Sequence, residues 1–424
     1  MRLRAGAADL RGSVPWLIVA LLAAALFLNY VDRGTLPTAA PLIQDELGFS
    51  PRQLGVLLSA FFWSYALLQI PVGWIAERFG AQRVLAIGLG VWALATMLVG
   101  VAHSFSTLIL LRVLLGIGES AGFPCVSKLL ATTVPVQRLG IANGVVAFAY
   151  LFGPAVGTKC GGLIMAAFGW RAAFFVFGGL SLLWLLPWSR VRLPPAARQA
   201  EDFASPGFGA VLRQRALWGT SLGHFSGNYT FYFMLTWLPY YLVRERGFSI
   251  AQMASLAGGA YLVNALSALT AGWAIDRFIG RCGSANLPYK LTMGIAHVGS
   301  VGCMLCMGLG SAAWAVAAIF AFQVLSGLSS PGTFAIPQLL AGPKAAARWV
   351  GVQNAIANLS GVVAPMLTGF LVEETHHFVS AFVIGALVSI LGLIGWVWIV
   401  PVVAPVRWQG LVRALPGSAA STPA

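Results

Sequence analysis

Charged residues are scarce in this sequence, and their scarcity excludes most soluble folds. Asp, Glu, Lys and Arg make up 9% of the 424 residues, whereas hydrophobic residues make up 58%. A soluble domain carries about 25% charged residues. Together with a mean hydropathy of +0.83, this composition is typical of a protein that lies within a lipid bilayer.

The sequence also lacks the patterns that metal centres, disulfide frameworks and catalytic sites require. Its five cysteines are scattered, and the one Cys-x-x-Cys pair, Cys303 and Cys306, lies in an apolar run without a nearby His or acid. Core packing is the favoured role for such cysteines. We find no nucleophile arrangement and no cofactor motif. We therefore expect no metal, no cofactor and no enzymatic activity.

What the sequence has instead is a series of long apolar stretches. About 20 apolar residues cross a bilayer as a helix, and backbone groups in lipid must be hydrogen-bonded within their own segment. The first stretch imitates a secretory signal but has no convincing cleavage site, so we expect it to remain as the first helix. The sequence predicts twelve transmembrane helices, at residues 14–43, 53–76, 83–102, 105–130, 139–166, 171–189, 216–243, 250–275, 289–310, 312–340, 349–372 and 378–403.

The net charge of +14 is explained by the membrane and does not indicate a nucleic acid partner. With the N-terminus in the cytoplasm, Lys and Arg concentrate in cytoplasmic segments, whereas the acids of the loops divide evenly. This is the positive-inside distribution of multi-pass membrane proteins. We expect an inner-membrane protein with both termini in the cytoplasm. The external loops would hold only Arg52, Arg171, Arg244 and Arg246 among the basic residues.

The two halves of the chain are related by an internal repeat. A shift of 199 positions places Asn29 on Asn228 and the stretch GWIAERF (73–79) on GWAIDRF (272–278); later the shift becomes 211. Six spans are thus followed by six related spans, a design that in transporters encloses a site near the bilayer midplane. We expect an N-terminal six-helix bundle at 1–189, a cytoplasmic linker at 190–215, a C-terminal bundle at 216–403 and a cytoplasmic tail at 404–424.

Four charged residues fall well inside the expected spans: Asp32, Arg33, Arg112 and Glu119. A charge that faces lipid at a helix centre costs about 2.5–3.5 kcal/mol, so these residues must face an aqueous cavity, one another, or both. The simpler interpretation of Asp32-Arg33 is that the first helix ends at Val31. The repeat argues against this, because the counterpart positions lie near the middle of a stretch without acids, Lys or Arg. We therefore expect the first helix to continue to about residue 44, bent by Pro37 and Pro41.

Arg112 and Glu119 are seven residues apart and so share one face of a helix. A buried ion pair that only fixes helix packing is the simpler explanation, yet such pairs stabilise less than apolar residues do. A functional role is therefore favoured. A further charge, Lys159, lies near the outer end of its expected helix, where extension to the membrane surface is favoured over a substrate contact.

Motifs in both halves carry a family resemblance. GWIAERFGAQR and GWAIDRFIGR resemble the loop motif of the major facilitator superfamily, although Glu77 stands where aspartate is usual. NYVDR and LLRVLLGIGESAGFPCVSKL resemble its anion:cation symporter family. The resemblance implies two pseudo-symmetric six-helix bundles that transport organic anions such as sugar acids. In the loop motif an acid and basic residues brace helix ends and help to control switching; the matching residues are Gly73, Glu77, Arg78, Gly80, Arg83, Gly272, Asp276 and Arg277.

The same resemblance implies roles for the intramembrane charges. Asp32 and Glu119 would carry protons, and Arg33 and Arg112 would bind the substrate. An arginine offers a planar fork of donors to a carboxylate, and protonation of its acidic neighbour would free it for that purpose. We expect Arg33 beside Asp32 and Arg112 with Glu119 to form two such units. The resemblance also implies pocket roles for Tyr30, Tyr65 and Asn358, for which a packing role is equally compatible.

In the second half, the counterparts of the four charges are neutral: Phe231, Tyr232, Gln323 and Ser330. This suggests that the N-terminal half holds ionic groups, while Tyr232, Gln323 and Ser330 shape the pocket. The favoured function is proton-coupled symport of a small organic carboxylate by a monomer, through alternating access. A drug/proton antiporter of the same fold is the alternative, which the paired arginines disfavour. A membrane-embedded enzyme would need a nucleophile, metal cluster or cofactor motif.

Overall fold

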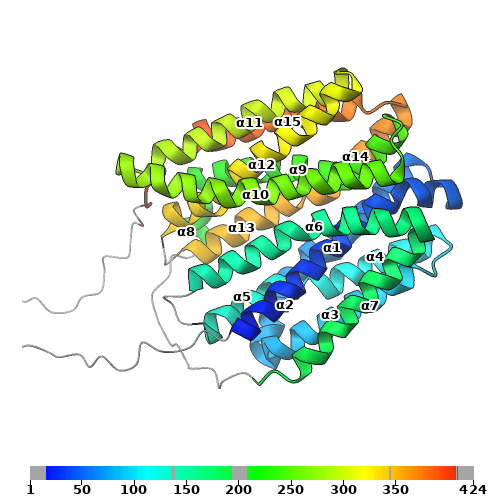
Figure 1. The fold of residues 1–424 in the computed structure, drawn as a ribbon. Coiled ribbons are helices and arrows are strands. Elements are labelled where there is room, and N and C mark those ends of the chain that lie inside the picture. The colour runs from blue at the N-terminus through cyan, green and yellow to red at the C-terminus, as the bar shows by residue number, and fades with distance from the viewer. Residues whose placement is uncertain (1–15, 135–138, 193–207, 343–344, 407, 409–424) are drawn as a thin grey trace, which may run out of the picture.

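The computed structural model describes residues 16–134, 139–192, 208–342, 345–406 and 408. Within these residues the protein is helical and contains no strand. The N-terminal helices lie together in the lower part of Figure 1, and the C-terminal helices lie in the upper part. The fold is the predicted pair of six-helix bundles.

The N-terminal bundle supplies the first six spans. The fourth span is divided between two helices, α4 and α5, at Ser120-Ala121. The helices are α1 (Trp16–Leu47), α2 (Pro51–Phe79), α3 (Ala81–Val99), α4 (Phe105–Glu119), α5 (Gly122–Thr133), α6 (Leu139–Phe168) and α7 (Trp170–Ser189).

The C-terminal bundle follows the short helix α8 (Phe208–Leu212). Its eleventh span is divided between α13 and α14, and its last span ends in a π-helical turn, η2. The elements are α9 (Arg215–Arg244), α10 (Ile250–Cys282), α11 (Asn286–Leu309), α12 (Ala312–Ala341), α13 (Ala346–Asn358), α14 (Ser360–Thr375), α15 (Val379–Leu393) and η2 (Ile394–Ile399).

Each of the twelve predicted spans coincides with one of these helices or helix pairs. Judged by length and composition alone, ten segments of the described residues are long and apolar enough to cross a membrane. Helices α2 and α9 are not among them. In α9 the reason is a set of buried polar side chains, which include Ser221, His224 and Ser226. These side chains lower the hydropathy of α9 although they face protein and not lipid.

Helix α1 continues without a break through Asp32 and Arg33 to Leu47, as the repeat predicts. Pro37 and Pro41 lie inside it, and each removes one backbone hydrogen bond. Threonine hydroxyls hydrogen-bond to carbonyls in the same part of the helix, with Thr38 Oγ1 2.7 Å from the Gly34 oxygen. The predicted end of the helix at about residue 44 is therefore correct to within one turn.

The internal repeat is visible in the way the second helix of each bundle begins. In α2 the Ser50 hydroxyl accepts a hydrogen bond from the Gln53 amide, and the Gln53 side chain accepts one from the Ser50 amide. Ser249 and Gln252 form the same capping box at the start of α10. These residues are related by the shift of 199. A capping box supplies partners for two backbone amides that the first turn cannot satisfy.

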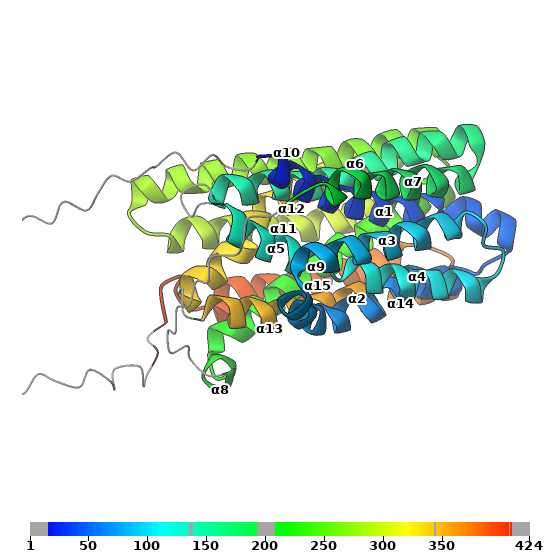
Figure 2. The ribbon, with the colours of Figure 1, turned by 90° about the horizontal axis from the view of Figure 1, so that it is seen from below.

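The two bundles meet mainly through three pairs of helices: α1 with α9, α2 with α14, and α6 with α10. Figure 2 shows α6 beside α10 along one edge of the molecule. Glycines permit the closest approach, because a Cβ atom on Gly55 would lie 2.6 Å from the Pro365 carbonyl oxygen, and one on Gly369 would lie 2.6 Å from that of Pro51. These contacts lie near the end formed by residues 45–52, 244–249 and 373–378, which we name the sealed end.

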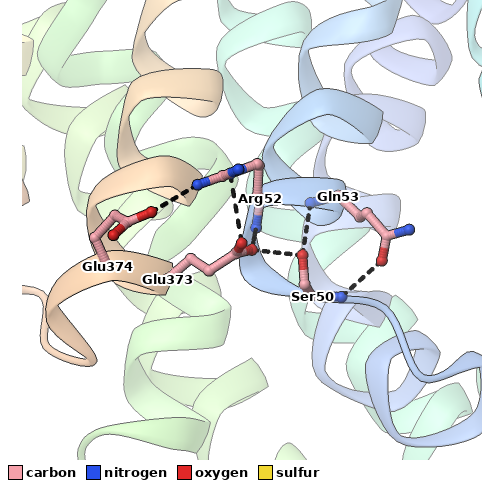
Figure 3. Close-up of polar contacts among 5 residues, drawn as sticks. All are labelled: Ser50, Arg52, Gln53, Glu373 and Glu374. Carbon is pink, nitrogen blue, oxygen red and sulfur yellow. Dashed lines mark hydrogen bonds and ion pairs between the residues drawn. The ribbon is translucent and has the colours of Figure 1, made fainter.

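Polar contacts join the bundles across the sealed end. Glu373 of α14 accepts hydrogen bonds from the Ser50 hydroxyl at 2.5 Å and from the Arg52 amide at 2.9 Å, at the start of α2 (Figure 3). The Arg52 guanidinium pairs with Glu373 at 3.4 Å and with Glu374 at 2.7 Å. Arg244 of α9 forms an ion pair with Asp45 of α1. The positively polarised N-terminus of α2 favours the carboxylate placed there.

Candidate substrate-binding site

All four intramembrane charges are buried inside the N-terminal bundle, and none faces lipid. Asp32 and Arg33 of α1 are 3% and 4% exposed, and Arg112 and Glu119 of α4 are 6% and 1% exposed. Charges so deeply buried are tolerated only when they have partners. Their partners are mainly one another.

Arg33 forms an ion pair with Glu119, in which Nε lies 3.1 Å from Oε2. Asn29, one helical turn before Arg33, also contacts the Glu119 carboxylate. The expected pairing of Arg33 with Asp32 and of Arg112 with Glu119 is therefore wrong. The reason is that spacing along one helix does not determine which side chains of another helix reach it: Asn29 and Arg33 share one face of α1, and Arg33 reaches Glu119 at the end of α4.

Asp32 belongs to the second part of the cluster. Its Oδ2 atom accepts a hydrogen bond from the Thr96 hydroxyl of α3 at 3.2 Å. Asp32, Thr96 and Arg112 line one small cavity of about 10 Å³. A space of this size holds about one water molecule. The second acid and the second arginine are thus close to each other; Asp32 directly precedes Arg33 in α1, and Arg112 lies two turns from Glu119 in α4.

Each of the four charged groups keeps unused hydrogen-bonding capacity. Within the described residues, no partner is found for Asp32 Oδ1, Arg33 Nη2, Arg112 Nε or Glu119 Oε1. A buried polar atom without a partner costs about 1–3 kcal/mol, and more when the group is charged. The cluster is therefore not optimised for stability, and these atoms are available to a proton or an anion.

Aromatic rings enclose the Arg33 guanidinium. Its Cζ atom lies 4.5 Å from the ring centre of Tyr30, 4.4 Å from that of Tyr65 and 4.8 Å from that of Phe61. Arg112 approaches the same Phe61 ring at 5.2 Å. Cation–π contacts of this kind contribute about 0.5–2 kcal/mol each. They hold Arg33 in place without using its N–H donors.

A central cavity of about 790 Å³ lies between the bundles, within the size range of small-molecule sites. It extends away from the sealed end, to Val350 and Gly351 near the start of α13. We name the opposite end, toward which it extends, the open end. Its described lining contains no Asp, Glu, Lys or Arg. The N-terminal bundle contributes mainly aromatic and proline residues, whereas the C-terminal bundle contributes most of the hydrogen-bonding groups, among them His224, Asn228, Asn264, Ser300, Ser330 and Asn358.

Tyr30 and Tyr65 contact both the cavity and Arg33, so they form the wall between the two. Tyr232 lies in the same region, next to Arg33, and its hydroxyl donates to Asn358 Oδ1 at 3.2 Å. An anion in the cavity could therefore reach Arg33 after a small movement of these rings.

Of the other residues expected in the pocket, some line the cavity and one does not. Ser330 and Asn358 line the cavity, but Gln323 does not. Gln323 is 1% exposed. Its backbone oxygen accepts a hydrogen bond from the Asn264 side chain, and Asn264 is the residue that lines the cavity here. Lys159 is exposed, and its Cβ atom packs against Gly258 of α10.

Several residues of the site were missed by the sequence analysis. The match of Asn29 with Asn228 was a usable signal, because the first contacts Glu119 and the second lines the cavity. Phe61 and Thr96 carried no signal, since an aromatic residue and a threonine in an apolar helix are ordinary core residues.

The loop-motif residues lie at the ends of α2 and α10, away from the sealed end. Gly80 joins α2 to α3 with φ +89°, a conformation that favours glycine. Arg83 is exposed near the start of α3, and the Lys128 ammonium of α5 donates to the Ala76 carbonyl oxygen at 3.0 Å. Arg78 and Arg277 lie near the rings of their neighbours Phe79 and Trp273. Gly73 is in α2 and Gly272 is in α10, and the side chains of Glu77 and Asp276 lie outside the described part of the structure.

Comparison with known proteins gives the same result as the geometry. The model of the Major Facilitator Superfamily matches residues 22–365. The "Probable sulfoacetate transporter SauU" of Cupriavidus necator is 30% identical, with 94% of this chain and 98% of that protein covered. The hexuronate transporter of Bacillus subtilis is 28% identical, with 87% and 90% covered. The "Probable galactarate/D-glucarate transporter GudP" of Escherichia coli is also 28% identical, with 89% and 91% covered.

A solved structure shares the fold. It is a bacterial homologue of the human lysosomal transporter Spinster in an inward-facing, unoccupied conformation, with a TM-score of 0.73, 20% identity and coverage of 92% of this chain and 97% of that one. The family match covers most of the chain, and the relatives are named as transporters of organic anions. This protein is therefore a membrane transporter, not an enzyme, and belongs to the Major Facilitator Superfamily.

Proposed function

We propose that this transporter carries a small organic carboxylate together with protons, in the same direction, by alternating access. The observation that carries the proposal is the buried Arg33–Glu119 ion pair directly behind the aromatic wall of the cavity. An arginine suits a carboxylate, and a carboxyl group that can lose its charge is the simplest control on that arginine.

In this mechanism Glu119 and the substrate compete for Arg33. When Glu119 is ionised, it holds Arg33 Nε, and the guanidinium is only partly available. When Glu119 takes up a proton, the ion pair is lost, and Nε and Nη2 can both bind a carboxylate. Loading the proton therefore promotes loading the anion, and release of one promotes release of the other.

Asp32 and Arg112 form a second unit of the same kind. Asp32 shares a cavity of one-water size with Arg112, and Arg112 shares Phe61 with Arg33. A change of charge on Asp32 alters the field at Arg112 and, through it, at Glu119 and Arg33. We assign Asp32 to proton transfer, and Arg112 to the stabilisation of the anion after the aromatic wall moves.

Access alternates between the two ends of the cavity. The present conformation has contacts across the sealed end and a cavity that extends to the open end. In the orientation that the positive-inside rule favours, the open end faces the cytoplasm of an inner-membrane protein. A monomer suffices, because a single chain supplies both walls of the cavity. The two buried arginines disfavour a cationic drug as cargo.

The test is uptake into proteoliposomes that hold the purified protein. Labelled sulfoacetate, D-glucuronate and D-glucarate represent the anions for which relatives are named. We expect at least one to accumulate above its external concentration when the outside is acidic, and to stop accumulating when a protonophore removes the gradient. Accumulation of the same size with and without the proton gradient would rule out proton coupling. Absence of uptake for every organic anion tried would rule out the substrate class.

A further inference from the structure

Three polar residues of α9 form a stripe along the cavity. His224, Asn228 and Tyr232 are spaced by four residues, which places them on one face of the helix, and all three line the cavity. A helix rises 1.5 Å per residue, so successive members of the stripe lie about 6 Å apart along the axis. The stripe extends about 12 Å from Tyr232, beside Arg33, to His224, nearer the open end.

A chain of hydrogen bonds determines which nitrogen of His224 carries the hydrogen. The Gln353 amide nitrogen of α13 lies 3.0 Å from the Thr333 carbonyl oxygen and 3.1 Å from His224 Nδ1. A carbonyl oxygen can only accept, so this position must be held by the NH₂ group of Gln353. Its second hydrogen then points to Nδ1, which must accept. Neutral His224 therefore carries its hydrogen on Nε2.

Asn228 continues this chain to the cavity. It lies one turn after His224 on the same face of α9, and the two side chains interact. Because His224 Nε2–H is a donor, it pairs with the amide oxygen of Asn228, and the Asn228 NH₂ group is left to donate. Gln353 and His224 are almost completely buried, so the arrangement is part of the packed wall.

We propose that Asn228, oriented by His224 and Gln353, is a second recognition site that binds an oxygen atom at the far end of the substrate. The inference rests on the function proposed above and narrows its substrate class. It selects acids with a carboxylate, sulfonate or hydroxyl group about 6 Å or more from the carboxylate held by Arg33. Asn228 would contact the substrate, and His224 and Gln353 would act as positioning residues.

The test compares two probes that differ in length. D-glucarate has a carboxylate at each end of a six-carbon chain, whereas glycolate is too short to reach from Arg33 to Asn228. Isothermal titration calorimetry of the purified full chain measures both affinities. Asn228→Leu removes the donor at similar volume. We expect D-glucarate to bind about three- to tenfold more weakly, the effect of one hydrogen bond, and glycolate to bind as in the parent protein.

Paired variants of His224 separate positioning from packing. His224→Gln places an amide N–H near the position of Nε2, whereas His224→Met fills the space without a donor. We expect His224→Met to weaken D-glucarate binding about threefold or more and His224→Gln to restore most of the loss. Ser221→Ala on the same helix is the control, because the Ser221 hydroxyl is buried, has no partner in the described residues and does not line the cavity.

Nitrogen NMR of ¹⁵N-histidine protein provides a measurement that needs no change of affinity. We expect the His224 resonances, assigned by their loss in His224→Gln, to show hydrogen on Nε2 and none on Nδ1. Hydrogen on Nδ1 would overturn the proposal, and so would an equal loss of both probes, or unchanged D-glucarate affinity, in Asn228→Leu. If the parent protein binds no carboxylate at all, the proposed function itself fails, and that result appears before any variant is made.

Discussion

The two bundles share a framework but differ in chemistry. Ser50 and Ser249 cap corresponding helices in the same way, which shows that the repeated backbone is preserved. The N-terminal bundle buries its four charges behind aromatic rings, whereas their counterparts in the C-terminal bundle are all neutral. The C-terminal bundle instead places amide, imidazole and hydroxyl groups directly on the cavity.

This difference separates two tasks that a transporter must perform. Ionic groups that control one another need a dry environment, where a single charge has a strong effect on its neighbours. Groups that recognise a cargo need contact with the lumen. A duplicated chain can assign one task to each copy, and corresponding positions in the two copies supply matched controls for substitutions in the charge cluster.

The largest effect is expected at Arg33. Arg33→Ala removes the guanidinium and leaves Glu119 buried without its partner, whereas Tyr232→Phe changes one hydroxyl at the position that corresponds to Arg33. We expect uptake of the preferred acid to fall about 100-fold or more in Arg33→Ala, and by about tenfold at most in Tyr232→Phe. The measurement is the initial rate of uptake into proteoliposomes that hold each variant. Similar losses in both variants would contradict the assignment of the charge to one bundle.

The next largest effect is expected at Glu119, on uptake driven by a pH gradient. Glu119→Gln keeps the shape of the side chain but removes its charge and its exchangeable proton. We expect accumulation driven by a pH gradient to be lost, while exchange of internal for external substrate continues, because Arg33 can still bind the anion. Ser330→Ala, at the corresponding position, should change both rates by less than about threefold. Accumulation in Glu119→Gln equal to that of the parent protein would refute the proton role.

A smaller effect is expected at the sealed end. A Cβ atom on Gly369 would lie 2.6 Å from the Pro51 carbonyl oxygen, so Gly369→Leu should keep α2 and α14 apart. Spin labels at Gly48 and His377, measured by double electron–electron resonance, should then show a longer distance in most molecules. Gly179→Leu is the control, because nothing lies within 4 Å of a Cβ atom there. An unchanged distance distribution would mean that this contact does not limit closure.

The ion pairs at the same end should contribute less than the glycine contact. Arg52 is about half exposed, and an exposed ion pair contributes about 0.2–1 kcal/mol and weakens in salt. We expect Arg52→Gln to increase the long-distance population of the same spin labels by about twofold to fivefold at low salt. In 1 M salt the parent protein should approach the variant. A salt-independent difference would show that Arg52 acts through packing.

The smallest effect is expected at Gln323, the counterpart of Arg112. Its Oε1 atom is buried without a partner in the described residues, and the side chain does not line the cavity. Replacement of such a group by an apolar one of similar shape is nearly neutral. We expect Gln323→Met to keep uptake within about twofold and to leave the thermal midpoint equal or slightly higher, whereas Arg112→Met should abolish uptake. A large loss in Gln323→Met would return this residue to the list of substrate contacts.

The fold was predictable because hydrophobic length and the repeat are strong signals in a membrane protein. The continuation of α1 past Asp32 followed from comparison with residues 216–243. The pairing within the charge cluster was not predictable, because spacing along α4 places Arg112 and Glu119 on one face but says nothing about α1. The approach of Arg33 in α1 to Glu119 in α4 is a property of tertiary packing.

The pocket was predictable only in part for a similar reason. The family resemblance indicated Tyr30, Tyr65 and Asn358, and the repeat indicated Tyr232 and Ser330, all of which line the cavity. They could not exclude Gln323, because a rotation of α12 by a fraction of a turn decides whether a residue faces the lumen or a neighbouring helix. His224 and Gln353 are far apart in sequence, so their hydrogen bond leaves no local pattern.

Helix α1 can bend easily just after Arg33, the residue proposed to bind the substrate. Pro37 leaves the Arg33 carbonyl without its usual amide partner, and Pro41 does the same for the Pro37 carbonyl. Arg244 of the opposite bundle donates to the Pro41 carbonyl oxygen at 2.9 Å. Bending here breaks few backbone hydrogen bonds, so the part of α1 that holds Arg33 can tilt while the part beyond Pro41 stays in contact with Arg244.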